Sequence, residues 1–187
     1  MQWANRGGIS PKQFICGYCG NIVASNEGFS TQDYPGGHQA FVYICPNCTE
    51  PSYFHIGKQI PGVAPGNKVA HLPHDIDALY LEARRAVSVG AYTASVLACR
   101  KLLMNIAVSQ GAIPGESFLS YVEYLAKAGY VPPNGRGWVD HIRSKGNEAT
   151  HEIKVMSSDD AIELISFSEM LLKFIFEFPN KVPGKTN

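Results

Sequence analysis

Four cysteines in the first quarter of the chain have the residue type and spacing of a metal site. They form two pairs, Cys16 with Cys19 and Cys45 with Cys48, and 25 residues separate the pairs. Each pair lets two thiolates reach one ion from a tight turn, and two such turns complete a tetrahedral site. Because four thiolates close the coordination shell, we expect a structural Zn²⁺ with no open position for a substrate.

A second polar group lies in the segment WVDHIRSKGNEATH, residues 138–151. If this segment is one helix, Arg143, Asn147 and His151 stand four residues apart and form one polar stripe. A cation and a titratable base on one stripe could hold a phosphate and move a proton. The same residue types also build buried polar clusters that fix the register of a helix. The spacing alone leaves both interpretations open.

The elements that position these groups differ between the two halves of the chain. Period-two patterns at residues 21–25, 39–44 and 52–56 predict strands around the cysteines. Residues 57–74 are rich in proline and glycine and read as a linker. From residue 75 the apolar period becomes helical. The expected organisation is therefore a zinc ribbon at 1–56, a linker at 57–74, a helical bundle at 75–178 and a flexible tail at 179–187.

The bundle is expected to contain about five helices. Asp75 is a candidate N-cap of the first, Ser117 of the third, and Ser157 with Asp160 of the last. The second helix carries an apolar seam that includes Cys99, which we interpret as a core residue. The seam consists of Tyr92, Val96, Cys99, Leu103 and Ile106. The predicted fold class is mainly α, a small β zinc ribbon followed by an antiparallel helical bundle.

The last predicted helix is apolar on more than one side. Besides its core face it carries a second stripe, formed by Phe167, Met170, Phe174 and Phe178. Excess apolar surface on a terminal helix indicates an interface. We expect a homodimer there; a seat for the ribbon is the alternative.

Composition limits the classes of partner. Lys and Arg number 16 and so do Asp and Glu, which gives no net charge and argues against a strongly basic nucleic-acid-binding surface. Local contact with RNA or DNA remains open, and the ribbon offers the aromatics Tyr18, Phe29, Tyr34 and Tyr53 for nucleic acid or protein. No run of eighteen apolar residues and no signal peptide are present. These features favour a cytoplasmic protein with no membrane partner.

Three stretches of the helical half resemble a known superfamily. They are DALYLEARR (residues 77–85), SVLACRKLL (residues 95–103) and RSKGNEATH (residues 143–151). Together with the last helix they resemble the HEPN superfamily, and within it a DUF-4145-type family of unknown-function domains found beside restriction-modification subunits. The resemblance implies a helical domain linked to restriction or defence, with a protein of such a system as partner.

Active members of that superfamily are typically metal-independent ribonucleases with an Arg–His motif at a dimer interface. Carried over, Arg143 would stabilise the charge on the phosphorane and His151 would act as general acid or base. Here seven residues separate the two, so a continuous helix places them about 12 Å apart along its axis. Three hypotheses follow: a protein- or nucleic-acid-binding module, an endoribonuclease using Arg143, Asn147 and His151, or a domain in which these residues are structural. The enzyme question stays open.

Overall fold

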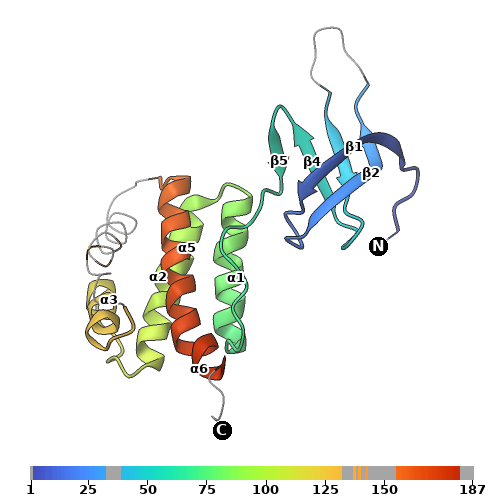
Figure 1. The fold of residues 1–187 in the computed structure, drawn as a ribbon. Helices are drawn as coiled ribbons and strands as arrows, with labels where there is room; N and C mark the ends of the chain where they lie inside the picture. Colours follow the sequence, from blue (N-terminus) through green and yellow to red (C-terminus); the bar gives the residue numbers. More distant parts are fainter. Residues whose placement is uncertain are drawn as a thin grey trace. The chain divides into compact units, whose positions relative to one another are not determined.

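The chain forms two compact units, Met1–Ala64 and Pro65–Asn187, each with its own apolar core. The structure is a computed structural model, which describes residues 2–32, 39–131, 137, 139, 142 and 155–181. The first unit is drawn in blue to teal and the second mainly in green to red in Figure 1. Within these described ranges, no helix is both long and apolar enough to cross a membrane.

The first unit is an antiparallel sheet in which each strand pairs with the next one along the chain. The strands are β1 (Gly7–Ile15), β2 (Ile22–Ser30), β3 (Phe41–Ile44), β4 (Pro51–His55) and β5 (Lys58–Ile60). In such a meander, the turn from β1 to β2 and the turn from β3 to β4 lie at the same end of the sheet. Those two turns carry the two cysteine pairs.

Aromatic side chains fill one face of this sheet. Phe14 of β1 and Tyr43 of β3 both pack edge-on against Phe54 of β4, with ring centroids 5.1 and 5.6 Å away. The hydroxyl of Tyr43 donates to the carbonyl of Ser10 at 2.8 Å, which gives the buried phenol a partner. Gly28 lets β2 approach β3, because a Cβ there would lie 1.9 Å from the carbonyl oxygen of Val42.

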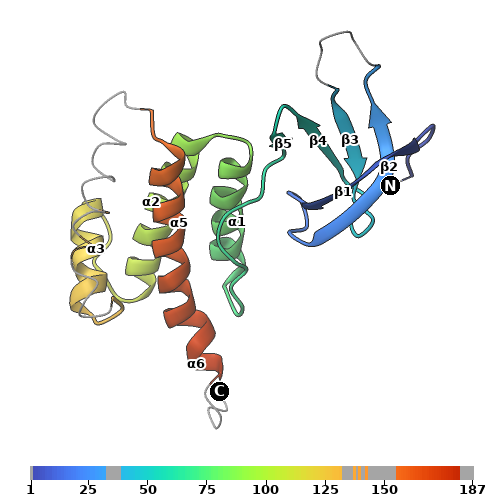
Figure 2. The same cartoon turned by 45° about the horizontal axis from the view of Figure 1, so that its top comes forward.

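The second unit is built from helices. They are α1 (His74–Ser88), α2 (Tyr92–Ser109), α3 (Phe118–Lys127), α5 (Ser158–Leu172) and the short α6 (Phe178–Lys181). Helix α2 packs on α1, α3 and α5, and in both Figure 1 and Figure 2 it runs alongside α1 and α5. Between α3 and α5, Gly137, Val139 and Ile142 also have helical backbones, and Val139 and Ile142 are buried.

The predicted seam of α2 is confirmed. Val96, Cys99, Leu103 and Ile106 are fully buried, and Tyr92 is half-buried. Two of the predicted caps are confirmed as well. Ser117 accepts from the backbone of Ser120, and Ser157 forms a reciprocal capping box with Asp160. The cap predicted at Asp75 is wrong: α1 begins at His74, after Pro73, which makes no side-chain cap.

A π-helical turn, Lys173–Glu177, joins α5 to α6. Such a turn adds one residue to an α-helix and shifts the direction in which later side chains point. Its last residue, Glu177, is buried, whereas the neighbouring Phe178 is 42% exposed. Glu177 at the end of the turn therefore faces the unit's interior, and no residue of α6 is buried.

The predicted fold class is wrong. Helix takes 45% and strand 19% of the described residues, so the chain is mixed rather than mainly α. Four helices of ten residues or more are present in the described ranges, and not a bundle of five. The sheet is larger than predicted, in part because the sequence analysis missed β1. This strand contains Gly7, Gly8 and Pro11, which are poor strand formers.

The segment expected as a linker, residues 57–74, is divided between the two units. Its beginning supplies β5, which pairs with β4. From Pro65 on it belongs to the second unit, where Val69 is buried in the helical core.

Candidate metal centre

The two cysteine-bearing turns have the same backbone hydrogen bonds. In the first, the N–H of Gly20 donates to Cys16 O and that of Cys16 donates to Asn21 O, at 2.8 and 3.0 Å. In the second, Thr49 donates to Cys45 O and Cys45 donates to Glu50 O, at 2.9 and 3.0 Å. The residue after the second cysteine has a positive φ in each, 74° at Gly20 and 61° at Thr49. Each turn therefore bends its two thiols toward one point.

The four sulfurs lie together with the spacing of a metal-binding tetrahedron. Cys16 Sγ is 3.6 Å from Cys48 Sγ, Cys19 Sγ is 3.8 Å from Cys45 Sγ, and all four lie within 4.8 Å of one another. Sulfurs bound to one zinc ion at about 2.3 Å stand roughly 3.8 Å apart in a tetrahedron. A disulfide needs about 2.05 Å, and all four cysteines are free. The cluster can hold a metal ion.

Without a cation, burial opposes ionisation of the clustered thiols. Cys16 and Cys45 are fully buried, and burial raises the pKa of Cys16. Burial, together with the neighbouring cysteines, raises the pKa of Cys48 to about 12. At Cys19 burial acts in the same direction, but hydrogen bonds from the Asn21 backbone and the Asn47 side chain outweigh it and lower the pKa to about 6. A divalent cation would offset the repulsion that opposes four thiolates in one place.

The ligand set is complete with cysteine alone. Among the described residues, these four form the only group of three or more histidine, cysteine or acidic side chains close enough to share an ion. His55 is not part of it, and His38 lies outside the described residues. A four-thiolate shell leaves no coordination position for water or substrate, which is the arrangement of structural rather than catalytic zinc.

The predicted polar stripe of the helical half lies outside the described residues. Its residues are Arg143, Asn147 and His151, so the structure does not test whether their side chains lie together. Ile142, one residue before Arg143, is fully buried.

A polar cluster that the sequence did not reveal ties the start of the second unit to α5. The Glu169 carboxylate accepts from the backbone and side-chain nitrogens of Asn67 at 2.9 and 3.0 Å, and it pairs with Lys173. Tyr80 donates to Asn67 O at 3.0 Å. Arg84 donates to the carbonyls of Pro65 and Gly66, both at 2.7 Å.

A second carboxylate acts in the same way further along the helix. Glu177 accepts from the backbone N–H of Ala70 at 3.1 Å and pairs with Lys181. Burial alone would raise the pKa of Glu169, but its hydrogen bonds from Lys173 and Asn67 dominate and lower it. The one signal in the sequence is that each glutamate precedes a lysine by four residues. These contacts hold residues 65–70 against the helices.

The fold and the cysteine cluster define a class of protein with a small β unit that carries four clustered cysteines and a separate helical unit. Residues 81–186 match the family described as Domain of unknown function (DUF4145). The match spans more than half of the chain, so the chain belongs to that family, which confirms the DUF-4145-type resemblance. No curated protein and no protein of solved structure matched the chain.

Proposed function

We propose that this chain is a binding module rather than an enzyme, and that its cysteine cluster holds a structural Zn²⁺. The observation that carries the proposal is the closed set of four thiolates at tetrahedral spacing. When bound, the ion supplies a cross-link between the β1–β2 turn and the β3–β4 turn. The ribbon is then a rigid platform, and the sheet face rather than the metal meets the partner.

Of the four aromatic residues of the ribbon named in the sequence analysis, two are exposed and can contact a partner. Tyr18 and Tyr53 are 53% and 38% exposed, so they are available to a partner. Phe29 is half-buried and packs edge-on against Trp3 at 6.3 Å, which gives it an internal role. Tyr34 lies outside the described residues.

For the helical unit we propose a HEPN-like domain that forms a homodimer and works in a restriction-linked or defence context. The support for a dimer is an apolar groove of about 370 Å³ on α5, the π-helical turn and α6, lined in part by Met170, Phe174 and Phe178. Phe174 and Phe178 are 45% and 42% exposed. Phe167, also expected on that surface, is fully buried and belongs to the unit's own core.

The first test is metal content. We expect one zinc per chain by elemental analysis of the purified protein, and loss of that zinc in Cys48→Ser. Cys99→Ser is the matched control, because Cys99 lies in the helical core and outside the cluster. A wild-type chain that binds no zinc from a zinc-supplemented buffer would overturn the metal assignment.

The second test decides between binding and catalysis. Zinc-loaded wild-type protein and His151→Ala are incubated with mixed-sequence RNA in a buffer without added divalent metal. We expect no cleavage by either protein. Cleavage by wild type that is lost in His151→Ala would instead establish the endoribonuclease built on Arg143 and His151 and would overturn the binding-module proposal.

A further inference from the structure

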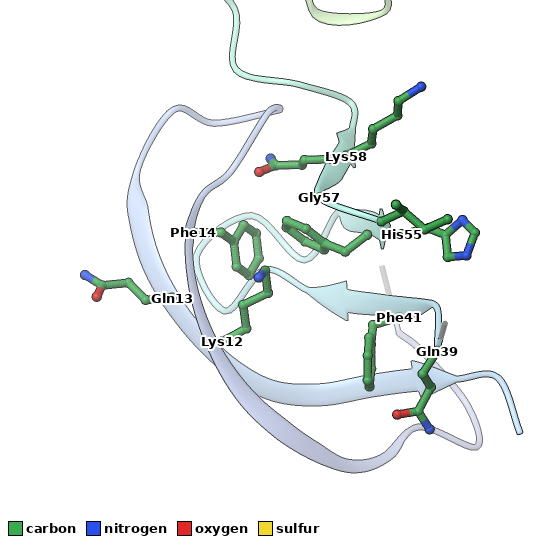
Figure 3. Close-up of a pocket in the computed structure, with 11 residues that line it drawn as sticks. Lys12, Gln13, Phe14, Gln39, Phe41, His55, Gly57 and Lys58 are labelled. Carbon is green, nitrogen blue, oxygen red and sulfur yellow. The ribbon is translucent and has the colours of Figure 1, made fainter. Parts of the chain in front are cut away.

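An open groove of about 450 Å³ lies on the first unit, away from the cysteine cluster. Its wall is made by side chains from β1, β3, β4 and β5 and from the residues beside them. In Figure 3, Lys12 reaches toward the ring of Phe14, Phe41 and Gln39 lie at one end, and Lys58 lies at the other. A groove of this size accommodates one nucleotide-sized group rather than a folded surface.

The floor of the groove is aromatic. Phe41 and Phe54 are cross-strand partners on β3 and β4, and both are only half-buried, so part of each ring faces the groove. Beneath them Phe14 is buried and packs edge-on against Phe54. Phe41 stacks on Tyr43 with a centroid distance of 5.8 Å and an interplanar angle of 28°. One side of the Phe41 ring therefore packs on Tyr43, and its exposed part is available to a ligand in the groove.

The charged side chains that line this groove are positive. The described residues that line the groove include Lys12, Lys58 and His55, several glutamines, and no carboxylate. Lys12 Nζ lies over the ring of Phe54, 4.9 Å from its centroid, and Lys58 is exposed. Neither lysine forms a salt bridge with any residue in the described ranges. On a chain of zero net charge, this is a local cationic site built over aromatic rings.

We propose that this groove binds single-stranded nucleic acid. A base stacks on Phe41, and flanking phosphates pair with Lys12 and Lys58. The side-chain nitrogen of Gln39 donates to Thr31 O at 3.1 Å, which leaves its side-chain oxygen to accept from the edge of the base. A duplex keeps its bases stacked inside, so only an unpaired base enters a groove of this size. An acidic peptide would use the lysines but not the flat ring. The inference deepens the binding-module function proposed above and rests on it.

The test measures binding by full-length, zinc-loaded protein. Fluorescein-labelled 12-nucleotide RNA, the same sequence in DNA, and its duplex are titrated by fluorescence anisotropy at several salt concentrations. Single strands of either sugar are expected to bind, and the duplex is expected to bind at least tenfold more weakly. Phe41→Ala is expected to weaken binding about tenfold, because base–aromatic stacking is lost.

The lysines have a separate and quantitative signature. For single strands each neutralised phosphate contributes about 0.7 to the slope of log K against log salt. The double variant Lys12→Gln with Lys58→Gln is therefore expected to reduce that slope by about 1.4. The matched controls are Ile22→Ala, an exposed apolar side chain of β2 that does not line the groove, and Lys101→Gln on the exposed surface of α2. Both controls are expected to change the Kd by less than about twofold.

Each contrary result has a distinct meaning. If the protein retains its zinc but binds no oligonucleotide, or if both groove variants bind as wild type does, the groove assignment is overturned and the structural zinc stands. Equal binding of the duplex, or full displacement by polyglutamate, overturns the base-stacking site as well. A chain without zinc overturns the proposed function itself. If Phe41→Ala loses zinc, the groove assignment is decided by the salt dependence of binding of the double variant Lys12→Gln with Lys58→Gln alone.

Discussion

Removal of a metal ion from the cysteine cluster is expected to unfold the first unit, Met1–Ala64, and to leave the second unit folded. The core cluster of the ribbon contains five buried side chains among the described residues, and two of them are cysteines. Ala40 and Ile44 are buried outside this cluster. The three others in the cluster, Phe14, Val23 and Tyr43, contribute about 1.5–3 kcal/mol each on burial. Binding of a structural zinc contributes about 10–16 kcal/mol in small zinc domains. A bound zinc ion would therefore stabilise the ribbon by more than these three side chains do.

The helical unit has a different source of stability. Its core holds 24 buried apolar side chains in the described ranges, and none of the four clustered cysteines belongs to it. It lies beyond residue 64 as a compact unit of its own. We expect its free energy of unfolding to be insensitive to the metal.

Hydrogen exchange followed by mass spectrometry separates the two responses. After treatment with a strong chelator, or in Cys48→Ser, peptides from β1 to β4 are expected to exchange within seconds, as unfolded chain does. Peptides from α1, α2 and α5 are expected to keep their protection. Retained protection in the metal-free ribbon would refute the reasoning that its apolar core is too small. Loss of protection in α2 would refute the independence of the two units.

Three further predictions concern the helical unit. Glu169→Gln is expected to lower its free energy of unfolding by about 1–3 kcal/mol in urea titration, because charged hydrogen bonds are lost, whereas Glu82→Gln on the exposed side of α1 has little effect. The pKa of Glu169 is lowered in the folded state. The stabilisation of the helical unit by Glu169 is therefore complete above the ordinary carboxyl pKa and is lost as the pH falls through the lowered value. If the free energy of unfolding of Glu169→Gln and of wild type fell identically with acid, this would be contradicted. Ser157→Ala is expected to cost about 1 kcal/mol through loss of the capping box, and an unchanged thermal midpoint would count against the cap. Gly66→Ala is expected to destabilise the unit by at least about 1 kcal/mol, because φ is 71° and the new Cβ would lie 2.8 Å from Glu169 Oε2 and 2.9 Å from the Tyr80 hydroxyl; a wild-type midpoint would show that the neighbours move aside freely.

The features that sequence reasoning predicted correctly are those in which the decisive residues are close in the chain. Each cysteine pair spans four residues, and each confirmed helix cap, at Ser117 and Ser157, also spans four. The seam of α2 repeats along a single helix. In these cases local geometry alone brings the groups together.

Features made by distant residues were not predictable in this way. Glu169 meets Asn67 across 102 residues, and no pattern near either one announces the contact. The groove combines Lys12 with Phe41 and Phe54, which only the pairing of the strands brings together. Strand β1 was missed because its glycines and proline oppose strand formation, and only tertiary pairing with β2 offsets that local preference.

The π-helical turn has a consequence for how sequences of this family align. Each helical residue advances about 100°, so Glu169 and Glu177 would point about 80° apart on a regular α-helix. One extra residue in between removes about 100° of rotation, which brings the two carboxylates to within about 20° of each other. Both in fact accept backbone N–H groups from the same short segment, at Asn67 and Ala70. A relative that lacks one residue between Lys173 and Phe176 would keep the contacts of both glutamates on a regular α-helix. A one-residue gap at this place in a sequence alignment would therefore mark a change from π-helix to α-helix, with the contacts retained.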